Sequence, residues 1–162
     1  MSRVKRPNRG FSLIELVIVV VIIAIIGAIA IPRMSRGAAG ASDSALVGDL
    51  AVLRNAIDLY ATEHTGTFPV VATFSDQLTL FSDSTGGTAA AKDTTHVFGP
   101  YLRRIPPLPM GANKGLATIV DGTTGTPGAA AGAWFYNPTT GEVKPNSADT
   151  EKDATGKIYN TY

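Results

Sequence analysis

The sequence predicts an α+β protein in which a long N-terminal helix packs on a small C-terminal antiparallel β-sheet. An apolar run over residues 11–31 is long enough for a membrane helix, and a stripe of apolar residues with helical spacing follows it over residues 46–60. Short β-type runs at residues 117–120 and 133–136 then predict strands, and a turn leads from the second of these into a third strand at residues 142–144.

Composition and charge exclude several classes of protein. The chain has 14 Lys and Arg against 13 Asp and Glu, a net charge of +1, but four of the basic residues lie in residues 1–10, which hold no acidic ones. The remainder is therefore mildly acidic and has no basic cluster, so we expect no nucleic acid as its main partner. The absence of cysteine excludes disulfides, thiolate metal sites and a cysteine nucleophile.

The apolar run over residues 11–31 has the length of a membrane span. As a helix it would be about 31 Å long, close to the roughly 30 Å hydrocarbon core of a bilayer. A spanning segment must pair its own backbone groups, so we expect a helix although Val and Ile favour strands in water. The basic residues 1–10 should stay cytoplasmic, which predicts a single pass with the C-terminal part outside.

A secretory signal peptide is the alternative interpretation of the same run. The small residues Ala28 and Ala30 would suit a signal peptidase site. The run is longer than the usual apolar region of such peptides, however, and Glu15 interrupts its beginning. Helical periodicity also resumes beyond Ile31, so cleavage there would divide a helix.

Glu15 is the one charged residue of the apolar run, and two roles suit it. Ser12 and Glu15 fit the capping box S-x-x-E, in which both side chains satisfy free N–H groups at a helix start. Capping explains how an acid is tolerated but does not explain its place in an apolar run, since a charge costs roughly 2.5–3.5 kcal/mol at the membrane centre and less near an end. The second role is therefore pairing with a positive charge.

Residues 9–17, RGFSLIELV, closely resemble the processing signal of type IV prepilins and type II secretion pseudopilins. The resemblance implies that prepilin peptidase removes residues 1–10 as a basic leader, cutting between Gly10 and Phe11, and N-methylates Phe11. It also implies that Glu15 meets the new amino group on Phe11 of a neighbouring subunit. That amine remains largely cationic near neutral pH, which supplies the missing partner.

Residues 32–66 are expected to continue the helix as an amphipathic segment. Pro32 lacks the N–H that a helix interior needs, and the resemblance makes it a site where the segment loosens in filaments; an ordinary kink at the membrane exit is the alternative. Ser42 or Asp43 would cap the amphipathic part and Gly66 would end it. The stripe expected to pack on the sheet comprises Leu46, Leu50, Leu53, Ile57 and Tyr60.

Three further segments are similar to the major pseudopilin, the G subunit, of type II secretion systems. They are the helix DLAVLRNAIDLY at residues 49–60, the turn GTFP at residues 66–69 and the segment GPYLRRIP at residues 99–106. The resemblance implies a pilin-like fold, with residues 67–162 as a periplasmic globular head. A short helix is expected within it, because Phe74, Leu78 and Phe81 have helical spacing.

The sequence contains no recognisable catalytic motif, and we expect no enzyme activity and no cofactor, with calcium as the one alternative. His64 and His96 have no metal-ligand spacing, so we expect them to be exposed or hydrogen-bonded in place. Major pseudopilins commonly bind calcium near the C-terminus, which makes the acidic residues of the tail weak calcium candidates, although the tail departs from the family's calcium loop. These candidates are Asp149, Glu151 and Asp153.

The function implied is a structural subunit of a type II secretion pseudopilus that drives protein export across the outer membrane. The expected partners are further copies of the chain, minor pseudopilins, the inner-membrane assembly platform and prepilin peptidase. The expected location is the inner membrane, with the head in the periplasm. Two alternatives stay open: a type IV pilus subunit for adhesion, motility or DNA uptake, and a signal-anchored periplasmic binding or enzymatic domain.

Overall fold

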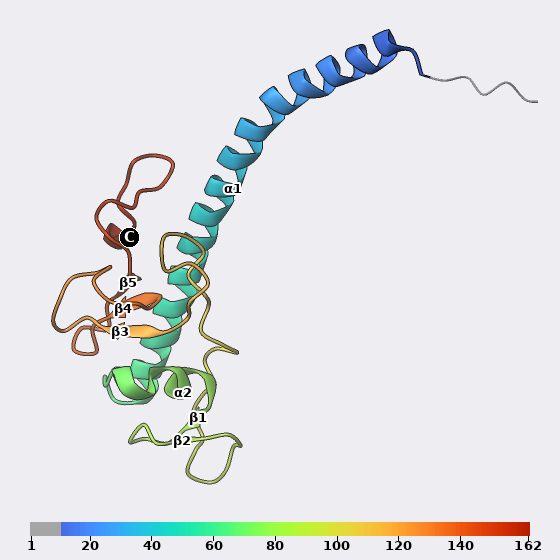
Figure 1. The fold of residues 1–162 in the computed structure, drawn as a ribbon. Helices are drawn as coiled ribbons and strands as arrows, with labels where there is room; N and C mark the ends of the chain where they lie inside the picture. The colour runs from blue at the N-terminus through green and yellow to red at the C-terminus, as the bar shows by residue number, and fades with distance from the viewer. Residues whose placement is uncertain (1–10) are drawn as a thin grey trace, which may run out of the picture. The chain divides into compact units, whose positions relative to one another are not determined.

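The computed structural model describes residues 11–162 and, within its long helix, the backbone alone of residues 30–36 and 39. That helix, α1 (Leu13–Glu63), is followed by a short helix α2 (Phe74–Thr79) and two small sheets (Figure 1). The chain divides into two compact units, one ending at Ala38 and a second over Ala39–Tyr162, called the head below. The predicted α+β fold class is confirmed.

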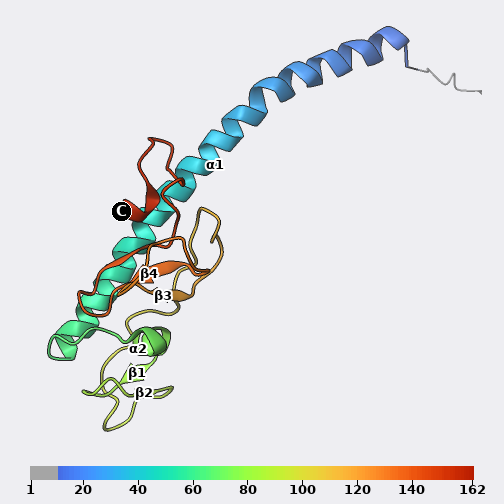
Figure 2. The ribbon, with the colours of Figure 1, turned by 60° about the vertical axis from the view of Figure 1, so that its left-hand side comes forward.

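The core of the head lies between α1 and the sheet that follows it in the chain. The predicted apolar stripe of α1 is fully buried, and it packs with Trp134, Tyr136 and Val143 of the sheet. The ribbon in Figure 2 shows this part of α1 running alongside the sheet. Burying one such aliphatic or aromatic side chain contributes roughly 1.5–3 kcal/mol, so this contact is the main source of stability in the head. The buried stripe residues are Leu46, Leu50, Leu53, Ile57 and Tyr60.

The main sheet has three strands in the order β3 (Ile119–Asp121), β4 (Trp134–Tyr136) and β5 (Val143–Pro145). All three predicted strands form, but the fully antiparallel arrangement was wrong. Strands β4 and β5 are antiparallel, whereas β3 and β4 are parallel. The physical reason is the connection over residues 122–133, because about a dozen residues are enough for the chain to return and re-enter the sheet in the same direction.

Helix α2 and a hairpin of β1 (Phe81–Ser82) and β2 (Thr88–Ala89) follow the end of α1 (Figure 1). A 3₁₀ turn, η1 (Val71–Thr73), leads into α2. The predicted short helix is confirmed, with Phe74 and Leu78 buried on its inner side. It is shorter than predicted, because Phe81 belongs to the strand β1 that pairs antiparallel with β2.

The boundaries predicted for the amphipathic helix need correction at both ends. No new helix starts at Ser42 or Asp43, because the backbone of α1 is helical throughout. The helix ends at Glu63, three residues before the expected Gly66, in a left-handed turn with Thr65 at φ 56°. The N–H of Gly66 donates to the carbonyl oxygen of Ala61 at 2.7 Å, which satisfies one of the carbonyl groups left free at a helix C-terminus.

The C-terminal tail, which ends in the 3₁₀ turn η2 (Tyr159–Thr161), is attached to α1 at two points. Asp43 accepts hydrogen bonds from the Tyr159 hydroxyl at 2.7 Å and from the N–H of Ala154 at 3.2 Å. About three turns further along α1, the guanidinium of Arg54 donates to the carbonyl oxygen of Tyr162 at 2.6 Å. Polar side chains of the helix thus tie down the tail beside the apolar core.

Candidate processing and assembly segment

The first turn of α1 forms the capping box that the sequence predicts. The N–H of Ser12 donates to Oε2 of Glu15 at 3.0 Å, and the N–H of Ile14 donates to Oγ of Ser12 at 3.3 Å. The N–H of Leu16 completes the turn by donating to the Ser12 carbonyl oxygen at 3.2 Å. Two of the free N–H groups at the helix start are therefore satisfied by side chains, and the carboxylate lies at the positive end of the helix dipole.

Glu15 is exposed, and within the first turn of α1 its carboxylate accepts the hydrogen bond from the N–H of Ser12. The ion pairs found among the described side chains lie in the head and involve His96 and Lys144, not Glu15. The structure thus confirms the capping role. Pairing of Glu15 with the amine of a neighbouring subunit needs a second copy of the chain and stays a prediction.

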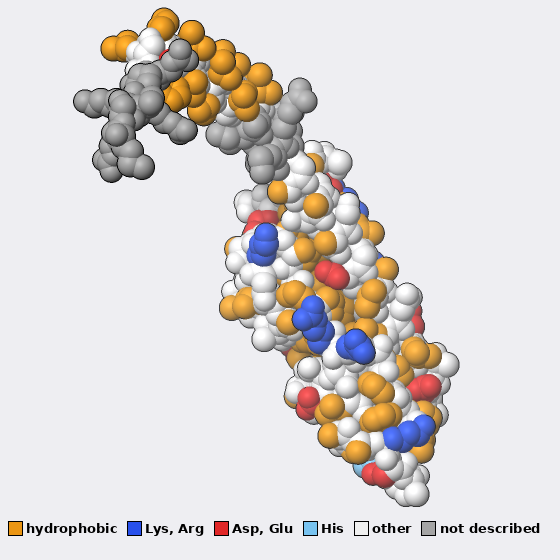
Figure 3. Space-filling view, turned by 90° about the vertical axis from the view of Figure 1, so that its right-hand side faces the viewer, with side chains coloured by type: hydrophobic (Ala, Val, Ile, Leu, Met, Phe, Trp, Pro, Cys, Tyr) orange, Lys and Arg blue, Asp and Glu red, His pale blue; other side chains and the backbone are white. Residues whose placement is uncertain are grey.

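The apolar part of α1 that follows Glu15 is exposed on all sides. Its large hydrophobic side chains keep between 45 % of their surface, at Val17, and 63 %, at Ile23, accessible, and Figure 3 shows hydrophobic side chains covering this part of the helix on the face in view. Among the described residues, no helix is both long and apolar enough for a membrane crossing. The last two residues of the expected span, 30 and 31, have side chains outside the described part.

Two of the predicted site residues lie partly or wholly outside what the structure describes. Gly10, on the leader side of the expected cleavage site, is not among the described residues, whereas Phe11 on the other side is described and exposed. Pro32 lies within the continuous helical backbone of α1, and its side chain is outside the described part. Its expected role in loosening the helix stays a prediction.

The three acidic residues considered for calcium do not converge on one point. Asp149 accepts from the side-chain amide of Asn160 at 2.8 Å. Glu151 accepts from the N–H groups of Ala112 at 2.6 Å and Ala148 at 3.0 Å. It therefore links the tail to the loop that contains Ala112. Each carboxylate is thus engaged by separate protein donors.

Asp153, the third of these acids, organises the loop around itself. Its carboxylate accepts from the hydroxyl of Tyr162 and from the hydroxyl and N–H of Thr155, both at 2.7 Å, and from the N–H of Lys157 at 2.9 Å. These donors, with the Tyr162 hydroxyl first, hold the pKa of Asp153 well below its usual range. Within the part of the chain that the structure describes, no group of three or more His, Cys, Asp or Glu side chains could hold a metal ion.

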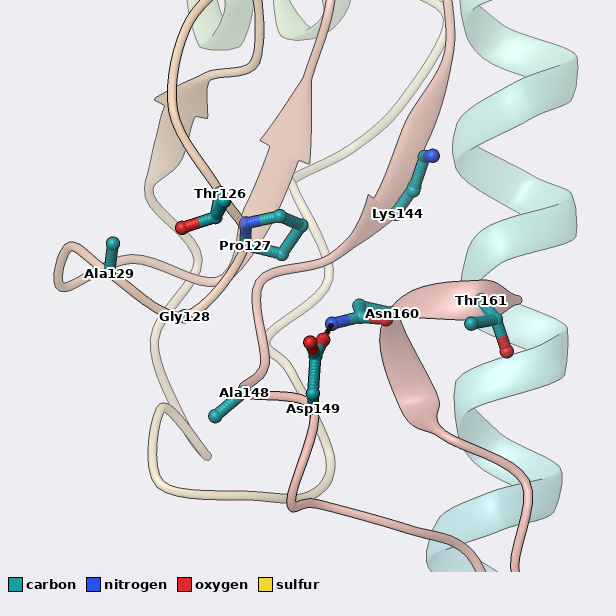
Figure 4. A pocket seen from close by; sticks show the side chains of 9 residues that line it. All are labelled: Thr126, Pro127, Gly128, Ala129, Lys144, Ala148, Asp149, Asn160 and Thr161. Atoms are coloured by element: carbon teal, nitrogen blue, oxygen red, sulfur yellow. Dashed lines mark hydrogen bonds between the residues drawn. The ribbon is translucent and has the colours of Figure 1, made fainter.

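A cavity of about 590 Å³ lies between the loop that follows β3 and the C-terminal tail (Figure 4). Its walls are mostly small or polar, and the side chains of Asp149 and Asn160 meet across its floor. Lys144 lies at its edge, where its ammonium group pairs with Glu142 at 2.9 Å. The lining residues are Thr126, Pro127, Gly128, Ala129, Lys144, Ala148, Asp149, Asn160 and Thr161.

The loop that forms one wall of this cavity is held by a buried asparagine. Asn146 accepts from the N–H of Gly128 at 2.6 Å and donates to the carbonyl oxygens of Ala130 and Gly132 at 2.8 and 2.9 Å. Burial of an amide is favourable only when its hydrogen bonds are made, as they are here. The cavity wall is therefore an ordered part of the head, and its groups serve the packing of the loop against the tail.

The two histidines have structural surroundings, as expected. His64 is buried at the end of α1, where its ring stacks on Tyr60 with a centroid separation of 3.8 Å and contacts the carbonyl oxygens of Tyr60 and Asp83. His96 pairs with Asp93 at 2.8 Å in the loop after β2. Sequence spacing could not reveal the contact of His64 with Asp83, because it joins the end of α1 to a residue nearly twenty positions later.

Comparison with known protein families finds a match in the N-terminal segment. Residues 5–31 match the model of the prokaryotic N-terminal methylation motif, the signal of type IV pilins and pseudopilins. The chain carries the N-terminus of a prepilin-like protein. No curated protein and no solved structure matches the chain.

The motif match indicates the general role of the exposed apolar segment of this prepilin-like protein. Such a motif implies processing by a prepilin peptidase, a membrane-anchored N-terminus and assembly of subunits into a filament. It covers Phe11, Glu15 and the apolar residues that the structure leaves without intramolecular packing. The residues that sequence reasoning missed are elsewhere: Asp43 and Arg54 fasten the tail, and no local pattern marks such distant partners.

Proposed function

We propose that this prepilin-like protein is a structural subunit of a type II secretion pseudopilus. The observation that carries the proposal is the contrast within the matched segment: an apolar helix with no packing partner in its own chain begins with a capped and exposed carboxylate, Glu15. Apolar surface of this extent is stable only in lipid or against other apolar helices. A filament whose subunits insert into and leave the inner membrane provides both environments.

Assembly is proposed to depend on the charge of Glu15. Removal of residues 1–10 would leave the amino group of Phe11 as the chain end, and an α-amino group with an ordinary pKa of about 7.7–8.0 is largely cationic near neutrality. Among apolar helices, Glu15 of one subunit would pair with this amine on the next, and an unpaired carboxylate there would be strongly unfavourable. The penalty for a mismatch then sets the register between neighbouring subunits.

The similarity of the helix and of the segment over residues 99–106 to major pseudopilins supports the type II assignment over a surface pilus. The lack of cysteine points the same way, since many type IV pilins close a C-terminal loop with a disulfide. The work proposed is mechanical, with energy supplied by a separate assembly ATPase and no reaction catalysed by this chain. Partners would be further copies, minor pseudopilins, the assembly platform and prepilin peptidase.

Two substitutions at one position separate capping from intersubunit pairing. Glu15→Gln keeps a side chain that can accept the hydrogen bond from Ser12, because Gln also serves in capping boxes, but it removes the charge. We expect Glu15→Gln and Glu15→Ala both to insert in the membrane and both to lose filament assembly, measured by the yield of sheared filaments. Normal assembly of Glu15→Gln would show that capping, and not the charge, is what the position supplies.

Cleavage of the leader and the choice between a type II pseudopilus and a type IV pilus are tested by separate experiments. Intact-mass measurement of protein extracted from membranes should show a chain that begins at methylated Phe11, and a bulky replacement of Gly10 should leave the precursor mass. Deletion of the gene should abolish secretion of exported enzymes and leave surface pili in place. The reverse result, lost pili with normal secretion, would assign the chain to a type IV pilus.

A further inference from the structure

His96, in the loop that follows β2, has an aspartate on either side of its ring. Its Nδ1 lies 2.8 Å from Oδ2 of Asp93, and its Nε2 lies 3.9 Å from Oδ2 of Asp83. Asp83 directly follows β1. A backbone pair between Ser82 and Phe98, with N–H···O distances of 3.1 Å in both directions, joins the two segments. The backbone of the head therefore brings His96 and Asp83 together from either side of the hairpin.

Hydrogen bonds within the two loops fix both carboxylates. Oδ1 of Asp83 accepts from the N–H and the hydroxyl of Thr85 at 2.8 and 2.7 Å. Oδ1 of Asp93 accepts from the N–H groups of Thr95 at 2.8 Å and His96 at 2.7 Å. The Thr85 hydroxyl is the first of the groups that hold the pKa of Asp83 below its usual range, and the N–H of His96 is the first for the pKa of Asp93. Both aspartates are therefore ionised, and their Oδ2 atoms face the imidazole.

Asp93 decides which ring nitrogen of His96 carries the proton. An ionised carboxylate only accepts hydrogen bonds, so Nδ1 donates its N–H to Asp93, and the neutral imidazole then has its lone pair on Nε2. That lone pair faces the carboxylate of Asp83, and at 3.9 Å the two atoms are too far apart to be joined by a hydrogen bond. Two electron-pair donors that face each other across such a gap attract a cation between them.

We propose that Nε2 of His96 and Oδ2 of Asp83 bind a divalent transition metal ion of the Zn²⁺ type. Two ligand atoms at zinc bond lengths and a tetrahedral angle lie about 3.4 Å apart, so the pair at 3.9 Å needs to close by about 0.5 Å. Imidazole suits zinc and its neighbours in the transition series, whereas calcium prefers oxygen ligands alone. A carboxylate on the other ring nitrogen, as Asp93 provides, is the usual way in which a metal-binding histidine is oriented.

Water has access to complete the coordination of the ion. The side chains of His96 and Asp83 keep 21 % and 27 % of their surface accessible, so the gap between them reaches the surface of the head. Two protein ligands are fewer than the four of a structural zinc site, and we therefore expect an open site that exchanges its ion. A bound ion would tie the loop after β2 to the end of β1. This role goes beyond the proposed function and does not depend on filament assembly.

Asp121 provides a matched control for Asp83. Its carboxylate forms the same kind of turn, accepting from the N–H and the hydroxyl of Thr123 at 2.8 and 2.7 Å. It ends β3 in the main sheet, whereas Asp83 belongs to the hairpin. Asparagine at either position keeps an oxygen that can accept these turn bonds and removes the negative charge. Asp83→Asn and Asp121→Asn therefore make the same chemical change in two different sheets.

Titration calorimetry of the full chain in detergent with Zn²⁺ measures the stoichiometry and the affinity. We expect one ion per chain, with binding at least about tenfold weaker in His96→Gln and Asp83→Asn and unchanged in Asp121→Asn. Asp93→Asn keeps an acceptor for Nδ1 without its charge, and it should weaken binding by about 10–100-fold. Binding that persists in His96→Gln, an equal loss in Asp121→Asn, or the absence of binding by the parent would overturn the site.

A measurement on the parent chain does not depend on whether the variants fold. Nitrogen NMR of the histidine rings should show that Zn²⁺ shifts Nε2 of His96 and leaves the ring of His64 unchanged. A shift at His64 alone, or at neither ring, would contradict the proposal, and so would calcium bound as tightly as zinc. Thermal unfolding without metal, followed by the fluorescence of Trp134, should give the same midpoint for the His96 and Asp83 variants as for Asp121→Asn.

Discussion

Between Leu46 and Tyr60 the large apolar side chains on one face of α1 are buried by other segments of the same chain, whereas from Leu13 to Ile29 those of the same helix are exposed on all sides. The residue types are alike in both regions, so hydrophobicity alone does not decide burial. The head supplies a sheet, a short helix and a tail to cover its stripe. The N-terminal region has no such cover in its own chain, and its stability depends on lipid or on other subunits.

Matched leucines on α1 give the largest expected effect. Leu53 is fully buried and Leu16 is 59 % exposed. Leu53→Ala should lower the free energy of unfolding of the head by about 2–5 kcal/mol, through lost burial and the cavity left behind. Leu16→Ala should change it by less than about 0.5 kcal/mol. Urea unfolding of the full chain in detergent, followed by the fluorescence of Trp134, measures both, and equal losses would contradict the division into a packed and an unpacked region.

Two aspartates on α1 test the attachment of the tail. Asp43 accepts from Tyr159 and Ala154, whereas the carboxylate of Asp58 is exposed. Asp43→Ala should cost about 1.5–3 kcal/mol, because hydrogen bonds to a charged group are lost. Asp58→Ala should cost less than about 0.5 kcal/mol. Limited trypsin digestion at Lys152 and Lys157 checks the same point, since a released tail should be cut faster in Asp43→Ala than in Asp58→Ala.

Acid should weaken the tail before it affects the apolar regions. Because hydrogen bonds lower the pKa of Asp153 relative to the unfolded chain, its contribution to stability is present above about pH 4 and is lost as the pH falls through the lowered pKa. Asp153→Asn should therefore flatten the fall in melting temperature between about pH 4 and pH 2. Parallel curves for the parent and the variant would assign the acid sensitivity to other carboxylates. The same bond raises the pKa of Tyr162 to about 12.

The smallest expected effect is at the start of α1. Ser12→Ala removes the oxygen that accepts from the N–H of Ile14 and should cost about 0.5–1 kcal/mol of stability in the first helical turn alone. Amide hydrogen exchange of Ile14 should become several-fold faster, while exchange at Leu53 stays unchanged. Faster exchange at both sites would mean that the first turn and the head are coupled more tightly than their separate packing indicates.

The elements of the head that depend on local pattern were predictable from the sequence. The buried stripe from Leu46 to Tyr60, the helix at Phe74 and the three strands each have a period or a turn signal of their own. The direction of β3 relative to β4 was not predictable, since it depends on how residues 122–133 return to the sheet. Strand type is a local property, whereas strand orientation depends on the path of the connection.

In the candidate site, too, local features were predictable from the sequence and contacts between distant residues were not. The capping box of Ser12 and Glu15 is local and could be predicted from four residues, and the structure confirms it. Asp43 was expected to cap a helix, because an aspartate before an apolar stripe usually does so. It instead binds Tyr159, more than a hundred residues later, and the sequence holds no signal for a pair that only the folded tail brings together.

The long connection between β3 and β4 also makes the head tractable for labelling. Residues 123–126 are exposed and lie outside the strand pairing, and Gly125 adopts φ 98° with open space around it. Extra residues at such a position lengthen a surface loop at little entropic cost. An epitope or fluorophore tag inserted between Thr124 and Gly125 would leave the strand register intact, so single subunits could be followed by microscopy in living cells.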